Sequence, residues 1–208
     1  MIKTQNISFT YNTNEHVFHF PNIKLSHGEH LLVLGKSGVG KTTLLHLIAG
    51  LLVPRSGNIC INDIEINALS NSKRDTFRGT SIGMVFQKKH ALSNVSVINN
   101  LKIRLFFTKK NEVPEINILL KQLGLFKIKN YKVKELSEGQ LQRLSVALAV
   151  IHQPKVILAD EPTSSLDDEN CQIVIELLIA QAKEKNANLI VITHDQRIKS
   201  YFKNAMEL

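Results

Sequence analysis

Three short, mainly apolar runs recur along the chain, at Leu31–Leu34, Val156–Ala159 and Leu189–Thr193. A run of this length with so few polar positions predicts a strand that is buried on both faces, as strands of a parallel sheet are. The residue that follows each run is a glycine, an aspartate or a histidine, so the ends of these strands are the first places to look for chemistry.

Helical spacing and strand-like alternation fill the segments between these runs. Ile116, Leu119, Leu120 and Leu123 recur at intervals of three and four, which predicts a helix that ends at Gly124. Strands that alternate with helices predict an α/β fold with a mainly parallel sheet. The expected helices begin at Lys41 and cover Gln140–Ile151 and Glu169–Lys183, and the further strands cover Ile7–Phe9, His16–Phe20, Asn58–Ile66 and Ser81–Phe86.

The composition suits a soluble globular protein with a single domain over residues 1–208. Hydrophobic residues make up 43% of the 208 residues, and the formal net charge is +8. A basic excess permits binding to nucleic acid or to an anionic surface, but without a dense basic run we interpret it as a solvated, lysine-rich surface. The longest apolar stretches fall well short of the roughly twenty residues that span a bilayer.

The segment Gly35–Thr42 matches the phosphate-binding pattern Gly-x-x-x-x-Gly-Lys-Thr. Its glycines let backbone N–H groups turn towards phosphates, and the following helix adds its positive end. Lys41 is expected to reach the outer phosphates, and the Thr42 hydroxyl to bind Mg²⁺. The residues expected to contact ATP here are Gly35, Lys36, Ser37, Gly38, Val39, Gly40, Lys41, Thr42 and Thr43.

Two adjacent carboxylates, Asp160 and Glu161, follow the second apolar run. In a protein with a phosphate-binding loop, one carboxylate at this place holds Mg²⁺ and the other polarises the attacking water. We therefore expect Asp160 at the metal and Glu161 as the general base. Taken alone, the pair would suit a helix start equally well, so this interpretation depends on the loop.

Further motifs follow in the order found in ATP-binding cassette (ABC) ATPases, and the chain resembles a nucleotide-binding subunit of that family. Gln87 resembles the glutamine that contacts Mg²⁺ and senses the membrane partner. Leu136–Gln140 resembles the signature segment, and Ser164–Asp167 resembles the D-loop, which contacts the other subunit. His194 resembles the histidine that contacts the terminal phosphate.

This resemblance implies an antiparallel N-terminal β subdomain and an α-helical signature subdomain inserted at about residues 88–153. Tyr11 stands where an aromatic ring of the family stacks on adenine, although simple packing on the surface is the alternative. The implied catalytic residues are Glu161, His194 and Gln87, the implied Mg²⁺ ligands are Thr42, Gln87 and Asp160, and the implied ATP contacts outside the loop are Tyr11, Ser137, Gly139, Gln140 and Asp167.

The signature stands at the start of a predicted helix, where Ser137 and the Gly139 backbone offer a second anion site. One chain already has a phosphate cradle at Gly35–Thr42, so a second such site makes sense if it serves the ATP of another copy. We therefore expect two copies to associate head to tail around ATP and to separate after hydrolysis.

A single cassette without a membrane span implies a separate permease, with the chain held at the cytoplasmic face of the membrane. Gly79–Gln87 is similar to the lipoprotein-releasing and macrolide or peptide exporter group, which favours export or envelope extrusion, and no nucleic acid is expected as a partner. The alternative is a non-transport ABC ATPase of DNA repair, translation, iron–sulfur assembly or a cell-division scaffold. The segment between Gln87 and the signature is too short for the coiled coil of repair relatives.

Two departures from the family pattern concern coupling to a partner. Glu138 replaces the commonest glycine of the signature, and Ala91–Asn100 lacks both a usual proline and a usual Glu-Asn pair. We expect hydrolysis to survive these changes and the choice of permease to depend on them.

Overall fold

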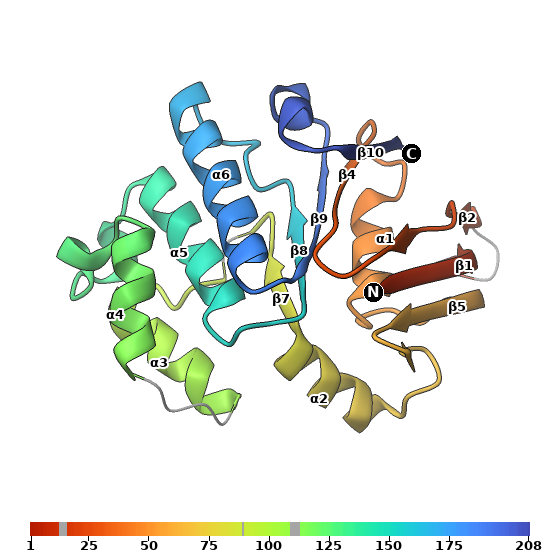
Figure 1. The fold of residues 1–208 in the computed structure, drawn as a ribbon, viewed down its shortest axis with the longest axis horizontal. Helices are drawn as coiled ribbons and strands as arrows, with labels where there is room; N and C mark the ends of the chain where they lie inside the picture. The colour runs from red at the N-terminus through yellow and green to blue at the C-terminus, as the bar shows by residue number, and fades with distance from the viewer. Residues whose placement is uncertain (13–15, 89, 109–112) are drawn as a thin grey trace.

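A sheet of five parallel strands forms the centre of the computed structural model, which describes residues 1–12, 16–88, 90–108 and 113–208. The strand order is β10-β4-β9-β8-β7, and Figure 1 shows this sheet between a group of helices on one side and a single helix with a second sheet on the other. Its strands are β4 (His30–Leu34), β7 (Ile82–Val85), β8 (Val156–Asp160), β9 (Asn188–Thr193) and β10 (Asn204–Glu207).

Successive residues of the central strands point to opposite faces, and both faces are buried. In β4, for example, Leu31 and Val33 belong to one apolar core, whereas Leu32 and Leu34 belong to the other. This two-sided burial is the physical reason that these strands are continuous apolar runs, because neither face contacts water. The three strands predicted from such runs are therefore confirmed.

A second sheet, antiparallel, covers one of these faces together with α1 (Lys41–Ile48). Figure 1 shows α1 between the two sheets, and side chains from all three layers share one core. The prediction of an antiparallel N-terminal sheet is confirmed. Its strands are β1 (Ile2–Phe9), β2 (Phe18–His19), β3 (Lys24–Leu25), β5 (Ser56–Ile61) and β6 (Ile64–Glu65).

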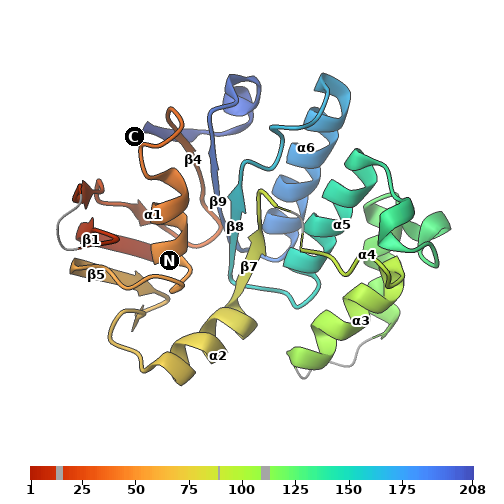
Figure 2. The ribbon, with the colours of Figure 1, turned by 180° about the vertical axis from the view of Figure 1, so that it is seen from behind.

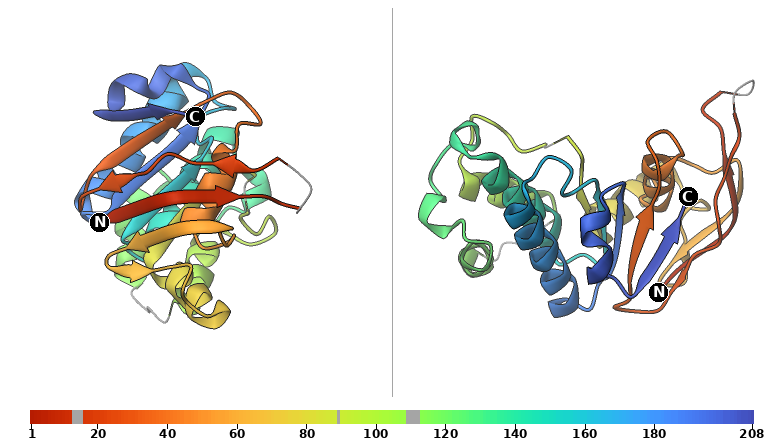
Figure 3. Two further views of the ribbon diagram at one scale, coloured as in Figure 1. Left: turned by 90° about the vertical axis from the view of Figure 1, so that its right-hand side faces the viewer. Right: turned by 90° about the horizontal axis from the view of Figure 1, so that it is seen from above.

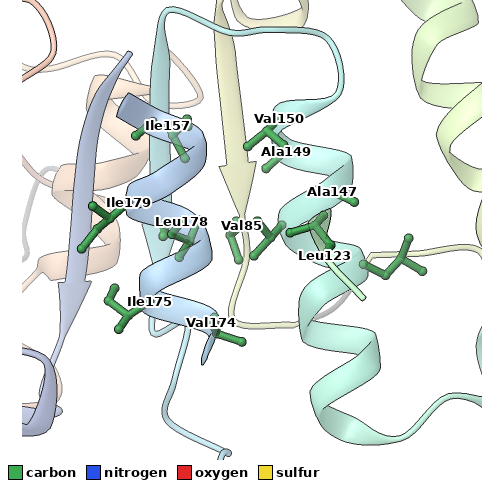
Figure 4. Close-up of a cluster of buried hydrophobic side chains, with 14 of the residues drawn as sticks. Val85, Leu123, Ala147, Ala149, Val150, Ile157, Val174, Ile175, Leu178 and Ile179 are labelled. Atoms are coloured by element: carbon green, nitrogen blue, oxygen red, sulfur yellow. The ribbon is translucent and has the colours of Figure 1, made fainter. Parts of the chain in front are cut away.

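Helices α5 (Glu138–Val150) and α6 (Asp168–Glu184) cover the opposite face of the parallel sheet (Figure 3). Figure 4 shows how their apolar side chains, among them Ala149 and Leu178, meet Val85 and Ile157 of the sheet. Helices α3 (Val97–Phe107) and α4 (Val113–Gln122) lie on the outer side of α5, farther from the sheet (Figure 2).

Two elements of the structure escape the sequence patterns. Helix α2 (Asn71–Ser81) buries none of its residues, so it has no apolar stripe to reveal it. Strand β10 is short and mostly exposed at the sheet edge, and only its pairing with β4 makes it a strand. Local composition is uninformative in both cases because packing against a neighbour defines the element.

Several predicted boundaries need correction. The strand predicted at His16–Phe20 is only Phe18–His19, because the pairing with β1 extends no further. The helix predicted to begin at Gln140 begins at Glu138, because Ser137 caps it. Three short 3-10 helices complete the part of the fold that the structure describes: η1 (Phe126–Ile128), η2 (Val133–Glu135) and η3 (Gln196–Tyr201). Among the helices of the described residues, none combines the length and the hydrophobicity needed to cross a membrane.

Close packing of α5 on β7 makes a prediction about Gly83. A Cβ atom at this position would overlap the carbonyl oxygen of Ala149 and lie 2.9 Å from Pro154. We expect Gly83→Ala to lower the free energy of unfolding by about 3 kcal/mol, because neither neighbour can move without disturbing the sheet. Urea denaturation measures this change.

Gly79→Ala is the matched control, since a Cβ there meets nothing within 4 Å and the residue lies in α2. Alanine should be neutral there or raise the stability by about 0.5–1 kcal/mol. Equal stabilities for the two variants would contradict the packing described for Gly83.

Candidate functional site

The carboxyl ends of four parallel strands meet at one edge of the central sheet. The register aligns Leu34 with Thr193 and Val85 with Ala159, so the segments that follow these strands emerge side by side. A crevice beyond the carboxyl ends of the strands is the usual ligand site of such sheets. The segment Gly35–Thr42, Gln87, Glu161 and His194, which are expected to act on phosphate, Mg²⁺ or water, all follow these strands.

The loop from Gly35 to Gly40 connects β4 to α1 and has the form of an anion cradle. Gly38 and Gly40 adopt φ angles of 85° and 99°, which side chains disfavour, and a Cβ at Gly40 would lie 2.8 Å from the Phe18 ring. Gly40 at the N-cap position of α1 offers no side chain, so the first N–H groups of this helix stay available to a phosphate. Lys36 and Ser37 are exposed and Val39 is half-buried in the same loop.

The Lys41 side chain is buried within this cradle. Its Nζ atom donates hydrogen bonds to the carbonyl oxygens of Gly35 at 2.8 Å and Lys36 at 3.0 Å. The same atom lies 3.7 Å from Oε1 of Glu161. The lysine therefore stands inside the loop, next to a carboxylate of a different strand, where it can exchange a carbonyl partner for a phosphate oxygen.

Oxygen atoms of Thr42 and Asp160 meet across the site at 2.9 Å, with the threonine hydroxyl as donor. The other Asp160 oxygen, Oδ1, is buried and accepts no hydrogen bond from the described residues. Burial raises the pKa of the Asp160 carboxyl, an effect that the bond from Thr42 opposes. An unsatisfied carboxylate oxygen beside a hydroxyl fits Mg²⁺, which prefers oxygen ligands and completes its shell with waters and phosphates.

Glu161 is held by the last residue of β9 and by the residue that follows it. Its Oε2 accepts a hydrogen bond from the Thr193 hydroxyl at 2.7 Å, and Nδ1 of His194 lies 2.9 Å from Oε1. The backbone of Glu161 has a φ of 48°, a left-handed conformation whose cost is of the order of 1–3 kcal/mol for a residue with a side chain. The structure thus unites two residues that were predicted separately, the candidate base and the candidate phosphate-contacting histidine.

Two further predicted residues lie around the cradle. Tyr11 is largely exposed; its hydroxyl lies 2.8 Å from the hydroxyl of Thr43, and its ring meets the edges of Phe9 and Phe18. Gln87 is exposed and follows β7 at the same sheet edge as Asp160.

The signature residues lie elsewhere. Ser137 and Gln140 form a capping box, in which the Ser137 hydroxyl accepts from the Gln140 N–H at 3.3 Å and the Gln140 side chain accepts from the Ser137 N–H at 2.9 Å. Helix α5 packs on α3, α6 and β7, whereas α1 packs on β8 and β9, so the signature and the cradle lie on different sides of the sheet (Figure 1). The structure does not bring Ser137, Gly139 and Gln140 to the cradle of their own chain.

Asp167 lies at the start of α6, where its Oδ1 accepts a hydrogen bond from the N–H of Asn170 at 2.8 Å, and this bond lowers the pKa of its carboxyl. The start of α5 packs against the same turn. A Cβ at Gly139 would lie 2.6 Å from the side chain of Asn170, and Glu138 accepts a hydrogen bond from Ser165 at 3.1 Å. The unusual Glu138 of the signature therefore contacts the D-loop of its own chain.

Four residues of the site were not found by sequence reasoning: Thr193, Asp195, Thr163 and Arg197. Thr193 orients Glu161, and Asp195 accepts hydrogen bonds from Thr163 and Arg197. These bonds, chiefly those from Arg197, lower the pKa of Asp195 to about 2. Adjacency to His194 was a signal for Thr193 and Asp195, whereas nothing local marks Thr163 or Arg197.

The chain is similar to known proteins over most of its length. The model of the ABC transporter family matches residues 18–164. The chain is 36% identical over 191 residues to the lipoprotein-releasing system ATP-binding protein LolD of Buchnera aphidicola subsp. Acyrthosiphon pisum (strain APS), covering 90% of this chain and 82% of that protein. It is 35% identical to LolD of Legionella pneumophila (strain Lens), with 85% and 79% covered.

Solved structures agree with the family. A dimeric structure of the ATP-binding cassette MJ0796, in a post-hydrolysis state bound to ADP and Pi, superposes with a TM-score of 0.89 at 29% identity and covers 100% of this chain and 94% of that one. The cbiO1 protein of Clostridium perfringens, part of the ABC transporter complex cbiONQ, superposes with a TM-score of 0.87 at 28% identity and covers 99% and 83%.

The matched family, the relatives of similar length and the cradle with its carboxylates lead to the same conclusion. The chain belongs to the ABC transporter family, as an ATP-binding subunit that hydrolyses ATP.

Proposed function

We propose that two copies of this chain bind ATP head to tail and use its hydrolysis to drive a separate membrane permease, in export or envelope extrusion. The observation that carries this proposal is the separation of the signature from the cradle within one chain. A helix start that offers N–H groups and a serine, yet lies away from its own cradle, can serve the phosphates of a second copy. The dimeric structure of the MJ0796 cassette supports the association of two copies.

The roles of the site residues follow from their positions. The cradle Gly35–Thr43 surrounds the phosphates with N–H groups, and Lys41 neutralises their charge. Thr42 and Asp160, with Gln87 from the loop after β7, would hold Mg²⁺. When bound, this ion would neutralise negative charge on the phosphate oxygens. Tyr11 would place its ring against adenine beside Thr43.

Glu161 is the proposed general base, and its fixed position is the main argument. Contacts with Thr193 and His194 fix the Glu161 carboxylate at the edge of the site, where it can accept a proton from water. His194, whose side chain is mostly exposed, is free to contact the terminal phosphate. From the second copy, Ser137, Gly139, Gln140 and Asp167 would complete the site.

A groove beside Gln87 is the proposed contact for the permease. Its walls include Met84, Phe86, Leu92, Ile103 and Phe107, which offer an apolar surface to a partner. Part of the groove is formed by the helical subdomain, about residues 88–153, which includes the segment Ala91–Asn100 that the sequence links to partner choice. The relatives named for a lipoprotein-releasing system and for a transporter complex support a membrane partner, which would place the chain peripherally at the cytoplasmic face.

The first test of this proposed function concerns Glu161. Because the glutamine side chain keeps the shape but cannot accept the proton, we expect Glu161→Gln to lower kcat by about 10²–10⁴-fold. ATP affinity should stay unchanged, and ATP should trap a dimer that sedimentation velocity detects. Lys41→Ala is the contrasting variant, which should lose ATP binding and remain monomeric. Normal turnover in Glu161→Gln would remove this residue from the role of base.

A second prediction tests whether the signature acts on the other copy. Ser137→Arg and Lys41→Ala should each abolish hydrolysis when either variant is present alone. Mixed in equal amounts, they form heterodimers in which one site carries both defects and the other is intact. ATPase activity should then return to about one quarter of the wild-type value, because random pairing makes half of all pairs heterodimers and each of these has one working site. A mixture as inactive as its components would contradict the shared site.

A third prediction concerns the permease. The tagged chain, purified from detergent-solubilised membranes of its own host, should retain a protein with several membrane spans. Phe107→Ser should weaken this retention, whereas Phe106→Ser should not, because the two side chains are similarly exposed and only Phe107 lines the groove. Retention of nucleic acid that salt removes, without a membrane protein, would favour a non-transport function instead.

A further inference from the structure

One side chain ties the segment Thr163–Asp168 to the loop that follows β9. The Arg197 guanidinium donates to both carboxylate oxygens of Asp195, at 2.9 Å from Nε and 2.8 Å from Nη2. It also donates to the carbonyl oxygens of Thr163 at 3.4 Å and Leu166 at 3.3 Å, and to Asp168 at 2.6 Å. This segment contains the D-loop, which has Asp167 at its end.

The partner of Arg197 in the other loop is firmly held. The Asp195 side chain is 8% exposed, and its Oδ2 also accepts a hydrogen bond at 2.9 Å from Thr163, which is fully buried. A carboxylate this deeply buried requires compensation by a cation and by hydrogen bonds. Arg197 supplies the cation, so its removal would leave Asp195 charged and poorly compensated.

A short chain of hydrogen bonds leads from this pair to the reacting centre. The N–H of Asp195 donates to the Thr193 hydroxyl at 2.9 Å, and that hydroxyl donates to Glu161 at 2.7 Å. The residue between them is His194, whose N–H and ring both meet Glu161. Any shift of Asp195 therefore displaces the groups that orient Glu161.

We propose that Arg197 is a positioning residue for ATP hydrolysis, which locks the D-loop to the loop of His194 so that Glu161 and Asp167 keep one fixed relation. This inference rests on the roles proposed above for Glu161, His194 and Asp167. Arg197 is not among the residues proposed above to contact ATP, Mg²⁺ or the attacking water. It acts by holding two segments that approach the site from different strands.

The planar guanidinium of Arg197 can hold both segments at once, whereas a lysine at this position cannot. Five N–H groups in one plane reach a carboxylate on one side and carbonyl oxygens on the other. A lysine retains the charge opposite Asp195 but cannot also reach Thr163 and Leu166. The charge and the geometry of the contact can therefore be tested separately.

Steady-state kinetics of the full-length chain provides the test. Arg197→Ala should lower kcat about tenfold, the effect of one lost charged hydrogen bond, while KM for ATP changes less than about twofold. Arg197→Lys should recover part of this loss. One control removes a neighbouring charge, Lys199→Ala in the same 3-10 helix. This variant should keep kcat within about twofold.

Each outcome decides the matter. A wild-type kcat in Arg197→Ala, or a loss of kcat in Lys199→Ala as large as in Arg197→Ala, would overturn the proposal. If Arg197→Ala does not fold, as thermal unfolding would show, Arg197→Lys decides, and an unchanged kcat in that variant overturns it. Glu161→Gln separates this proposal from the previous one: if it is inactive while Arg197→Ala is normal, only the positioning role fails.

Discussion

Burial of the parallel sheet on both faces is the constraint on which the rest of the structure depends. The antiparallel sheet and α1 cover one face, and α5 and α6 cover the other, so the central strands contact no water except at their ends. Apolar burial of this extent is the main favourable contribution to folding. The polar groups of the cradle and its carboxylates therefore lie at the ends of the strands, at the edge where the carboxyl ends of β4, β7, β8 and β9 meet.

The site at this edge contains groups that are unfavourable for folding. An Asp160 oxygen is buried without a hydrogen bond from the described residues, α1 begins without a capping side chain, and Glu161 adopts a left-handed backbone. Each of these lowers the stability of the protein without ATP, and burial in the adjoining core offsets this cost. The first two also match what ATP with Mg²⁺ brings, since a cation satisfies the carboxylate and an anion satisfies the helix start.

The D-loop segment is held mainly by polar contacts rather than by the apolar core. The D-loop segment is tied on one side to the loop after β9 through Arg197, and on the other side to the start of α5 through Ser165 and Glu138. Both links join the segment that carries Asp167 to parts of the chain that face different ATP molecules in the proposed dimer. Side-chain hydrogen bonds at the surface are individually weak, so this region can change its arrangement more easily than the sheet can.

Sequence alone determined the fold class, the cradle and its carboxylates, because all three depend on local signals. Buried strands are apolar runs, a phosphate loop requires glycines at fixed spacing, and the order of the motifs identified the family. The tertiary structure alone decided the rest. It defined α2 and β10, whose residues carry no periodic pattern, and it joined Thr163 and Asp195 to Arg197. It also separated Ser137 from Lys41. These are contacts between residues distant in the chain, and no local pattern records which segments the sheet brings together.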